Sequence, residues 1–203
     1  PMVKELFRIG FPIFLNSMAN GLYWSVDAIL ITVMLPADQL GIYGFGLIVF
    51  PLVQLVPEQF AVVSGQRMAR QMGERGRKDL RHVIPFFEES QSVVIWITVC
   101  AAAGAGILFV PVVHTFFPDY IAAIPLCHAL LFGFLFYRFR AVTGFYLSLT
   151  DRQGLLLAIQ SGSIALNGLG DWAVLRAGWG IGAVAWVCAG SYVLFGIVIM
   201  MVA

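Results

Sequence analysis

The sequence predicts an all-α membrane protein that crosses a bilayer six times, and three observations support this. Of the 203 residues, 60% are hydrophobic and 11% are charged, whereas a soluble domain carries about 25% charged residues. Apolar runs recur that are long enough to span a bilayer, which takes about 20 residues. The one long polar stretch, residues 66–82, holds six of the twelve basic residues. The apolar runs beside it are too long for a basic helix on a soluble surface.

The six predicted spans make up a single domain, residues 1–203. We place them at about residues 6–35, 40–63, 83–113, 120–149, 155–175 and 181–202. We expect the second span to continue as a helix into the basic stretch, and short polar turns to join the others. Because the chain begins at Pro1 and stops inside an apolar run, we expect it to be a piece of a longer protein.

The basic residues predict how the spans are oriented, because cytoplasmic segments carry an excess of Lys and Arg. With the N-terminus inside, the outer side receives only Arg176. The cytoplasmic side then receives nine basic residues: Lys4, Arg8, Arg67, Arg70, Arg75, Arg77, Lys78, Arg81 and Arg152. We therefore expect a multi-pass protein of the cytoplasmic (inner) membrane, with its N-terminus and the 66–82 loop in the cytoplasm.

Prolines and small residues within the spans predict helices that bend and pack closely. A proline removes a backbone donor and can kink a helix, and the spans contain Pro12, Pro51, Pro57, Pro85 and Pro125. Small residues let helices approach, and they cluster at 41–46, 101–106 and 178–182. Residues 180–185 match the form GxGxxA, but no strand precedes them, so we interpret them as helix packing. The alternative is ordinary membrane-helix composition.

Two spans carry a stripe of polar side chains on one helix face, because the residues recur at intervals of three or four. The stripes are Asn16, Asn20, Tyr23 and Asp27 in the first span, and Gln160, Ser163, Asn167 and Asp171 in the fifth. Facing lipid is costly for such groups, so each stripe should face protein or a water-filled lumen. We interpret Asn16, Asn20, Tyr23 and Asn167 as candidate substrate-binding residues, and Asp27 and Asp171 as candidate ion-coupling residues. The alternative is hydrogen bonding that only holds the helices together.

Charged residues in two other spans are further candidates. Glu58, in the middle of the second span, is a third candidate ion-coupling residue. Arg138 and Arg140 lie in the inner half of the fourth span, about 200° apart around a helix, so they cannot point the same way. They either bind an anionic group such as phosphate through fork-like hydrogen bonds or extend to the cytoplasmic headgroups.

Motifs for catalysis and for cofactors are absent from the sequence. It contains no GxxxxGK[ST], HExxH, GxSxG or DDxxD pattern, and its three histidines lie on separate segments. The three cysteines lie in apolar runs without CxxC spacing, which favours buried free thiols. We therefore expect no enzymatic activity, no cofactor and no bound metal. The net charge of +1 also gives no reason to expect a nucleic-acid partner.

The order of several short motifs resembles the polysaccharide flippases of the multidrug/oligosaccharidyl-lipid/polysaccharide exporter superfamily. The resemblance covers nearly the whole chain, and it is carried by the order and spacing of motifs that are individually weak. They are IGFP at 9–12, Asp27, LGIYG at 40–44, QRMAR at 66–70 with Gly73, LN at 166–167, and GWGIGA at 178–183.

Members of this family place two six-helix bundles around a central cavity, so the resemblance implies that this chain is one bundle. The motif at 40–44 looks more like the C-terminal bundle. The resemblance also implies alternating access, in which the two bundles rock around a central site. The implied substrate is an isoprenoid pyrophosphate carrying an oligosaccharide, which is moved to the outer leaflet for synthesis of cell-surface polysaccharide. The implied partners are this glycan lipid, membrane lipids and a second bundle.

Two other functions compete with this interpretation. A drug/cation antiporter of the same superfamily would use Asp27, Asp171 or Glu58 to bind a proton or sodium ion. Two arginines facing the lumen would count against it, because they repel a cationic substrate. A membrane-embedded transferase acting on lipid-linked sugars needs clustered carboxylates to hold a metal. The adjacent pair Glu88–Glu89 has no further metal-ligand residue at a useful spacing.

Overall fold

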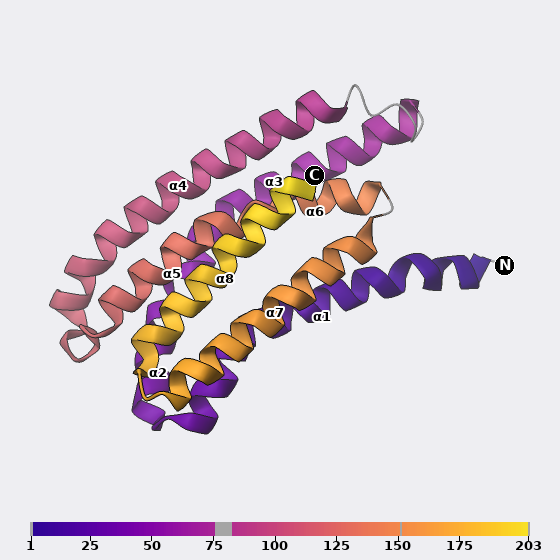
Figure 1. Ribbon diagram of the computed structural model, residues 1–203. Coiled ribbons are helices and arrows are strands. Elements are labelled where there is room, and N and C mark those ends of the chain that lie inside the picture. Colours follow the sequence, from indigo (N-terminus) through magenta and orange to yellow (C-terminus); the bar gives the residue numbers. More distant parts are fainter. Residues whose placement is uncertain (1, 76–82, 151, 203) are drawn as a thin grey trace.

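The computed structural model describes residues 2–75, 83–150 and 152–202, and these are helical almost throughout (Figure 1). A short 3-10 helix, η2 (Pro118–Tyr120), lies between α4 and α5. The α-helices are α1 (Met2–Met34), α2 (Ala37–Leu47), α3 (Val49–Arg75), α4 (Val83–Phe116), α5 (Ala123–Tyr137), α6 (Arg140–Leu149), α7 (Gln153–Arg176) and α8 (Gly180–Val202). These described ranges contain no strand, and the predicted all-α fold is confirmed.

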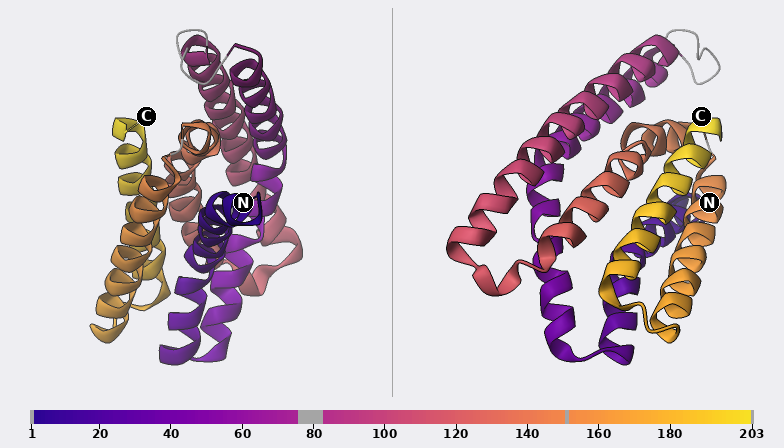
Figure 2. Two further views of the ribbon diagram at one scale, coloured as in Figure 1. Left: turned by 90° about the vertical axis from the view of Figure 1, so that its right-hand side faces the viewer. Right: turned by 60° about the vertical axis from the view of Figure 1, so that its left-hand side comes forward.

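The helices run back and forth along one bundle. α2 and α3 together follow the second predicted span, and α5 and α6 follow the fourth, so the described residues form six helical segments when each pair is counted once. The N-terminus, the end of α3 and the start of α7 lie towards one end, and the α1–α2 and α7–α8 turns lie towards the other (Figure 1). Figure 2 shows α3 and α4 side by side, extending together beyond the other helices.

The surface and length of the helices are those of a membrane protein. Four segments are long and apolar enough to cross a bilayer: Ala37–Gly73, Ile84–Phe116, Ala123–Leu149 and Gly180–Val202. Large apolar side chains such as Val33, Leu52 and Met201 point outward and are more than 70% exposed. Exposed apolar side chains in such number are unfavourable in water and suit lipid. The remaining two segments, α1 and α7, carry the polar stripes, which make them less apolar, so their assignment as spans stays a prediction.

The second span breaks where the sequence places Pro51. Proline cannot donate to the carbonyl four residues earlier, and its ring clashes with that carbonyl. The affected carbonyl belongs to Leu47, the residue at which α2 ends. The predicted kink at Pro51 is therefore confirmed. Pro85 and Pro125 likewise lie third in α4 and α5, as Pro51 does in α3, where a missing N–H costs little. All three prolines therefore lie at helix starts.

The fourth span breaks at Arg138 and Phe139 without a proline. The N–H of Phe139 bonds back only three residues, to Phe136, and the next α-helix begins at Arg140. From α4, the side-chain amide of Gln91 donates to the carbonyl of Phe139 at 3.1 Å. Gln91 thus joins α4 to the start of α6, because Phe139 is the N-cap residue of α6. No proline within the span predicts the break.

Small residues bring α5 and α8 into close contact, although not at the predicted clusters. A Cβ added at Gly133 would lie 2.5 Å from the Cα of Ala189, and one at Gly196 would lie 2.5 Å from the carbonyl oxygen of Phe136. Gly178 and Gly180 have open space around them and φ values of 78° and 72°. They therefore form the α7–α8 turn, because few other residues adopt this conformation. The interpretation of Gly180 as a helix-packing residue was wrong.

Replacing Gly133 by alanine is expected to destabilise the bundle, because the new methyl group meets backbone that cannot yield without moving a helix. Overpacking of this kind costs about 1–3 kcal/mol. The measurement is the midpoint of thermal unfolding in detergent. Gly190→Ala, on the open side of α8, is the control, since a Cβ there meets nothing within 4 Å. Equal midpoints for the two variants would contradict the close α5–α8 contact.

Candidate functional site

The two polar stripes face each other inside the bundle, because α1 packs against α7. The hydroxyls of Tyr23 and Ser163 lie 2.8 Å apart, and the amide of Asn167 donates to Asp27 Oδ1 at 2.5 Å. Near the other end, the amide of Asn16 donates to the Gln153 carbonyl at 3.4 Å. The alternative interpretation, hydrogen bonding between helices, therefore describes most of the contact between the stripes. Tyr23 and Asn167 are fully buried, so their predicted role in substrate binding stays a prediction.

The stripes form the centre of a buried polar cluster drawn from four helices. We define this cluster as Tyr23, Asp27, Tyr43, Ser163, Asn167, Asp171 and Ser191. Both carboxylate oxygens of Asp27 accept hydrogen bonds. Oδ2 accepts from the Tyr43 hydroxyl at 2.5 Å, and Oδ1 accepts from the Asn167 amide. Ser191 on α8 donates to Asn167 Oδ1 at 3.1 Å, which fixes the amide with its nitrogen towards Asp27. Asp27 is thus held by α2 and α7 together.

The second carboxyl group of the cluster, Asp171, has no such support. It follows Asn167 by one helical turn on α7, is fully buried, and interacts electrostatically with Asp27. Neither of its oxygens accepts a hydrogen bond from the described residues. Two carboxyl groups that share a buried site cannot both carry a charge cheaply. A proton or a metal cation between them would remove the repulsion and satisfy the unused oxygens.

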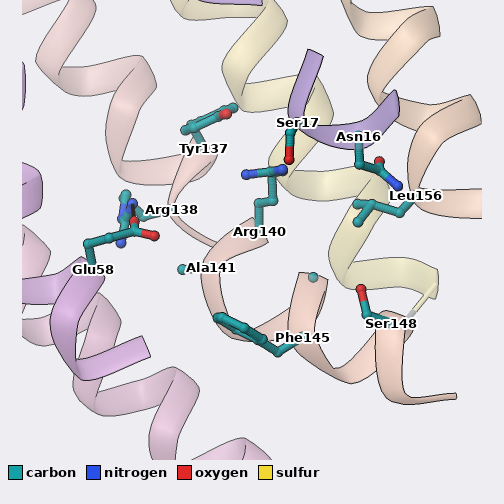
Figure 3. A pocket seen from close by; sticks show the side chains of 11 residues that line it. Asn16, Ser17, Glu58, Tyr137, Arg138, Arg140, Ala141, Phe145, Ser148 and Leu156 are labelled. Atoms are coloured by element: carbon teal, nitrogen blue, oxygen red, sulfur yellow. Dashed lines mark hydrogen bonds and ion pairs between the residues drawn. The ribbon is translucent and has the colours of Figure 1, made fainter. Parts of the chain in front are cut away.

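A second polar feature is a pocket of about 270 Å³ between α1, α3, α5, α6 and α7 (Figure 3). Its polar lining includes Asn16, Ser17, Glu58, Tyr137, Arg138 and Arg140. The hydroxyl of Tyr137 donates to Asn20, which ties the pocket wall to α1. The ring of Tyr137 stacks on that of Tyr23 with 5.5 Å between centroids. A continuous set of contacts therefore runs from the pocket to the buried polar cluster.

Both arginines line this pocket, and they do so because the helix breaks between them. Arg138 caps α5, is 4% exposed, and pairs through Nη1 with Glu58 Oε2 at 2.8 Å. Arg140 is the first residue of α6, and in Figure 3 its side chain extends towards Ser17 and Tyr137, away from Arg138. The two point in different directions, as predicted, but they reach the same space. The alternative, in which these side chains extend to the cytoplasmic headgroups, stays a prediction.

The predicted site residues thus divide between two places. Asn16, Arg138 and Arg140 line the pocket, together with Glu58, which was predicted as an ion-coupling residue. Asn20 borders it through Tyr137. Tyr23, Asn167, Asp27 and Asp171 belong to the buried polar cluster.

Sequence reasoning missed three contributors to these sites. Tyr43 and Ser191 hold Asp27 and Asn167, and Tyr137 connects the two sites. Tyr43 is a lone polar residue in an apolar run, and neither Ser191 nor Tyr137 belongs to one of the two polar stripes, so no stripe pattern singles them out. Tyr43 does lie within the LGIYG motif at 40–44.

No protein-family model matches the chain, and neither a curated protein nor a solved structure is significantly similar to it. The resemblance to polysaccharide flippases therefore stays a prediction from the motifs alone.

Removing the Tyr43 hydroxyl is expected to destabilise the protein, because Asp27 Oδ2 then stays buried without its donor. A hydrogen bond to a charged group contributes about 1.5–3 kcal/mol. Tyr43→Phe should lower the thermal midpoint accordingly. Tyr120→Phe is the matched control, because the Tyr120 ring packs on Phe45 and its hydroxyl bonds to none of the described residues. Equal effects of the two changes would argue against the Asp27 contact.

Proposed function

We propose that this chain is one bundle of a cation-coupled membrane transporter that works by alternating access. The observation that carries the proposal is the buried polar cluster, in which Asp27 and Asp171 are both buried and interact with each other. Ionisable residues at such depth are costly, and in membrane proteins they commonly mark ion or proton pathways. We assign the cation, a proton or a sodium ion, to the space between these two carboxyl groups.

The difference between the two carboxyl groups favours a transport role over a purely structural one. Structural hydrogen bonding explains Asp27, which accepts from Tyr43 and Asn167. It explains Asp171 only if this carboxyl group shares a proton with Asp27, because no described residue donates to its oxygens. A sodium ion prefers oxygen ligands, and the cluster offers carboxylate, amide and hydroxyl oxygens. A proton would instead link the two carboxyl groups directly.

For the transported substrate, our first candidate is the one implied by the sequence motifs, an isoprenoid pyrophosphate that carries an oligosaccharide. The protein would flip it across the cytoplasmic membrane for cell-surface polysaccharide synthesis, together with a second six-helix bundle. Arg140 supports an anionic group, because it lines the pocket and makes no ion pair with a described residue. The N-terminus and the 66–82 loop would face the cytoplasm. Of that loop, residues 76–82 lie outside the described residues.

The second candidate is an antiporter that exchanges a proton or sodium ion for a cationic drug. One structural observation favours this antiporter more than the sequence alone does. Glu58 neutralises Arg138, so only one of the two arginines adds uncompensated positive charge to the pocket. Repulsion of a cationic substrate is therefore weaker than two unpaired arginines would give.

The cation site is tested by stability in sodium chloride against choline chloride at equal ionic strength. A ligand at 100 times its Kd raises the free energy of unfolding by about 2.7 kcal/mol. We expect sodium to raise the thermal midpoint of the wild type, and this rise to disappear in Asp27→Asn and Asp171→Asn. Asp119→Asn, at an exposed position in η2, should keep it.

If the coupling cation is a proton, sodium has no effect. Acid–base titration of the folded protein then shows fewer bound protons at neutral pH in the doubly substituted Asp27→Asn/Asp171→Asn variant than in the wild type. A protein that responds to neither cation through these two residues would contradict the proposal.

A further inference from the structure

We propose that the pocket lined by Arg138 and Arg140 binds a phosphate-type oxyanion, and that Glu58 competes with this anion for Arg138. The inference rests on the proposed transport function and names the charged group of its substrate. The oxyanion would be the phosphate or pyrophosphate of an ester, whether it belongs to a transported substrate or to a lipid headgroup.

The charges of the pocket call for an anion. Its lining contains two cationic side chains and one carboxylate, Glu58. Because the carboxylate is paired with Arg138, the positive charge of Arg140 is left over. An uncompensated cation within a membrane protein's interior is unfavourable and attracts a counter-charge. An anion of one or two charges would bring the pocket close to neutrality.

The free donors of Arg138 suit an oxyanion in particular. The guanidinium uses Nη1 for Glu58, while its Nε and Nη2 have no hydrogen-bond partner and are buried. These two nitrogens form the side edge of the guanidinium, which donates two parallel N–H bonds to carboxylate or phosphate oxygens. Arg140 Nε is buried and unpartnered as well. The residues that line the pocket therefore include three guanidinium nitrogens without a partner among the described residues. These nitrogens are closed to solvent while Glu58 holds Arg138, and an anion would reach the Arg138 pair once Glu58 moves aside.

Glu58 differs from its partner in a way that allows displacement. The Arg138 side chain is 5% exposed, whereas that of Glu58 is 48% exposed. Glu58 can therefore withdraw into the open part of the pocket while Arg138 stays fixed, held also by the Phe134 ring, 5.8 Å away. An anion that enters the pocket would bind Arg138 in place of Glu58. The negative charge of Glu58 would repel this anion while the carboxylate remained near. Neutralising Glu58 should strengthen anion binding.

The experiment is a binding titration of the purified full chain with three probes. Inorganic pyrophosphate tests a free oxyanion, farnesyl pyrophosphate tests a lipid-linked one, and nanodiscs with or without phosphatidylglycerol test a headgroup. We expect Glu58→Gln to tighten binding about tenfold, the ratio equal to about 1.4 kcal/mol. Arg140→Ala should weaken it about 10- to 150-fold, the range for a hydrogen bond to a charged group.

Matched variants separate the pocket from general attraction between charges. Arg67→Ala removes an exposed cation on α3, outside the pocket, and should leave binding unchanged. Arg140→Lys keeps the charge without the fork and should fall between Arg140→Ala and the wild type. If Glu58→Gln fails to fold, the comparison of Arg140→Lys with Arg140→Ala still tests whether the pocket binds the oxyanion.

Several results would overturn the proposal. They are no binding of any probe by folded wild type, weaker or unchanged binding by Glu58→Gln, or equal losses for Arg140→Ala and Arg67→Ala. The probe that binds most tightly identifies the source of the oxyanion. Because the sodium and proton responses depend on Asp27 and Asp171, the pocket can fail this test while the cation site stands, and the reverse also holds.

Discussion

The structure depends most on the hydrogen bonds that Asp27 accepts from Tyr43 and Asn167 in the interior of the bundle. In a bilayer the apolar effect does not drive helices together, so packing and polar contacts must hold them. These two bonds join α1 to α2 and to α7, and Ser191 extends the connection to α8. Close packing of α5 on α8 at Gly133 and Gly196 completes the bundle. The polar residues that hold the helices together are thus the ones proposed to bind the cation.

The same contacts offer a physical route between cation and substrate. Tyr137 borders the pocket, bonds to Asn20, and stacks on Tyr23, whose hydroxyl lies 2.8 Å from that of Ser163 in the buried polar cluster. Adjacency alone does not establish coupling, which requires an element with two arrangements that both sites influence. The break between α5 and α6 is the natural element, because Arg138 and Arg140 lie on either side of it. A change of partner at Arg138 would act directly on this break.

The sequence predicts those features that repeat along one helix and misses those that need a partner helix. Hydropathy predicts the helical segments, and the spacing of Asn16 to Asp27 and of Gln160 to Asp171 predicts two polar faces. Periodicity cannot say that these faces would meet each other, because that depends on which helices are neighbours. The hydrogen bond from Gln91 on α4 to the Phe139 carbonyl joins residues 48 positions apart, and the pairing of Glu58 with Arg138 joins residues 80 positions apart. Such contacts are set by packing and leave no local pattern.

The most direct test of the central claim is infrared difference spectroscopy of the folded protein upon adding sodium or changing pH. A cation held between Asp27 and Asp171 predicts a carboxyl signal that responds to sodium or to protons. That signal should disappear in Asp171→Asn and persist in Asp119→Asn, since Asp119 is exposed in η2. A wild-type spectrum without such a signal, or one that Asp171→Asn leaves unchanged, would contradict a cation site and leave the buried polar cluster with a structural role alone.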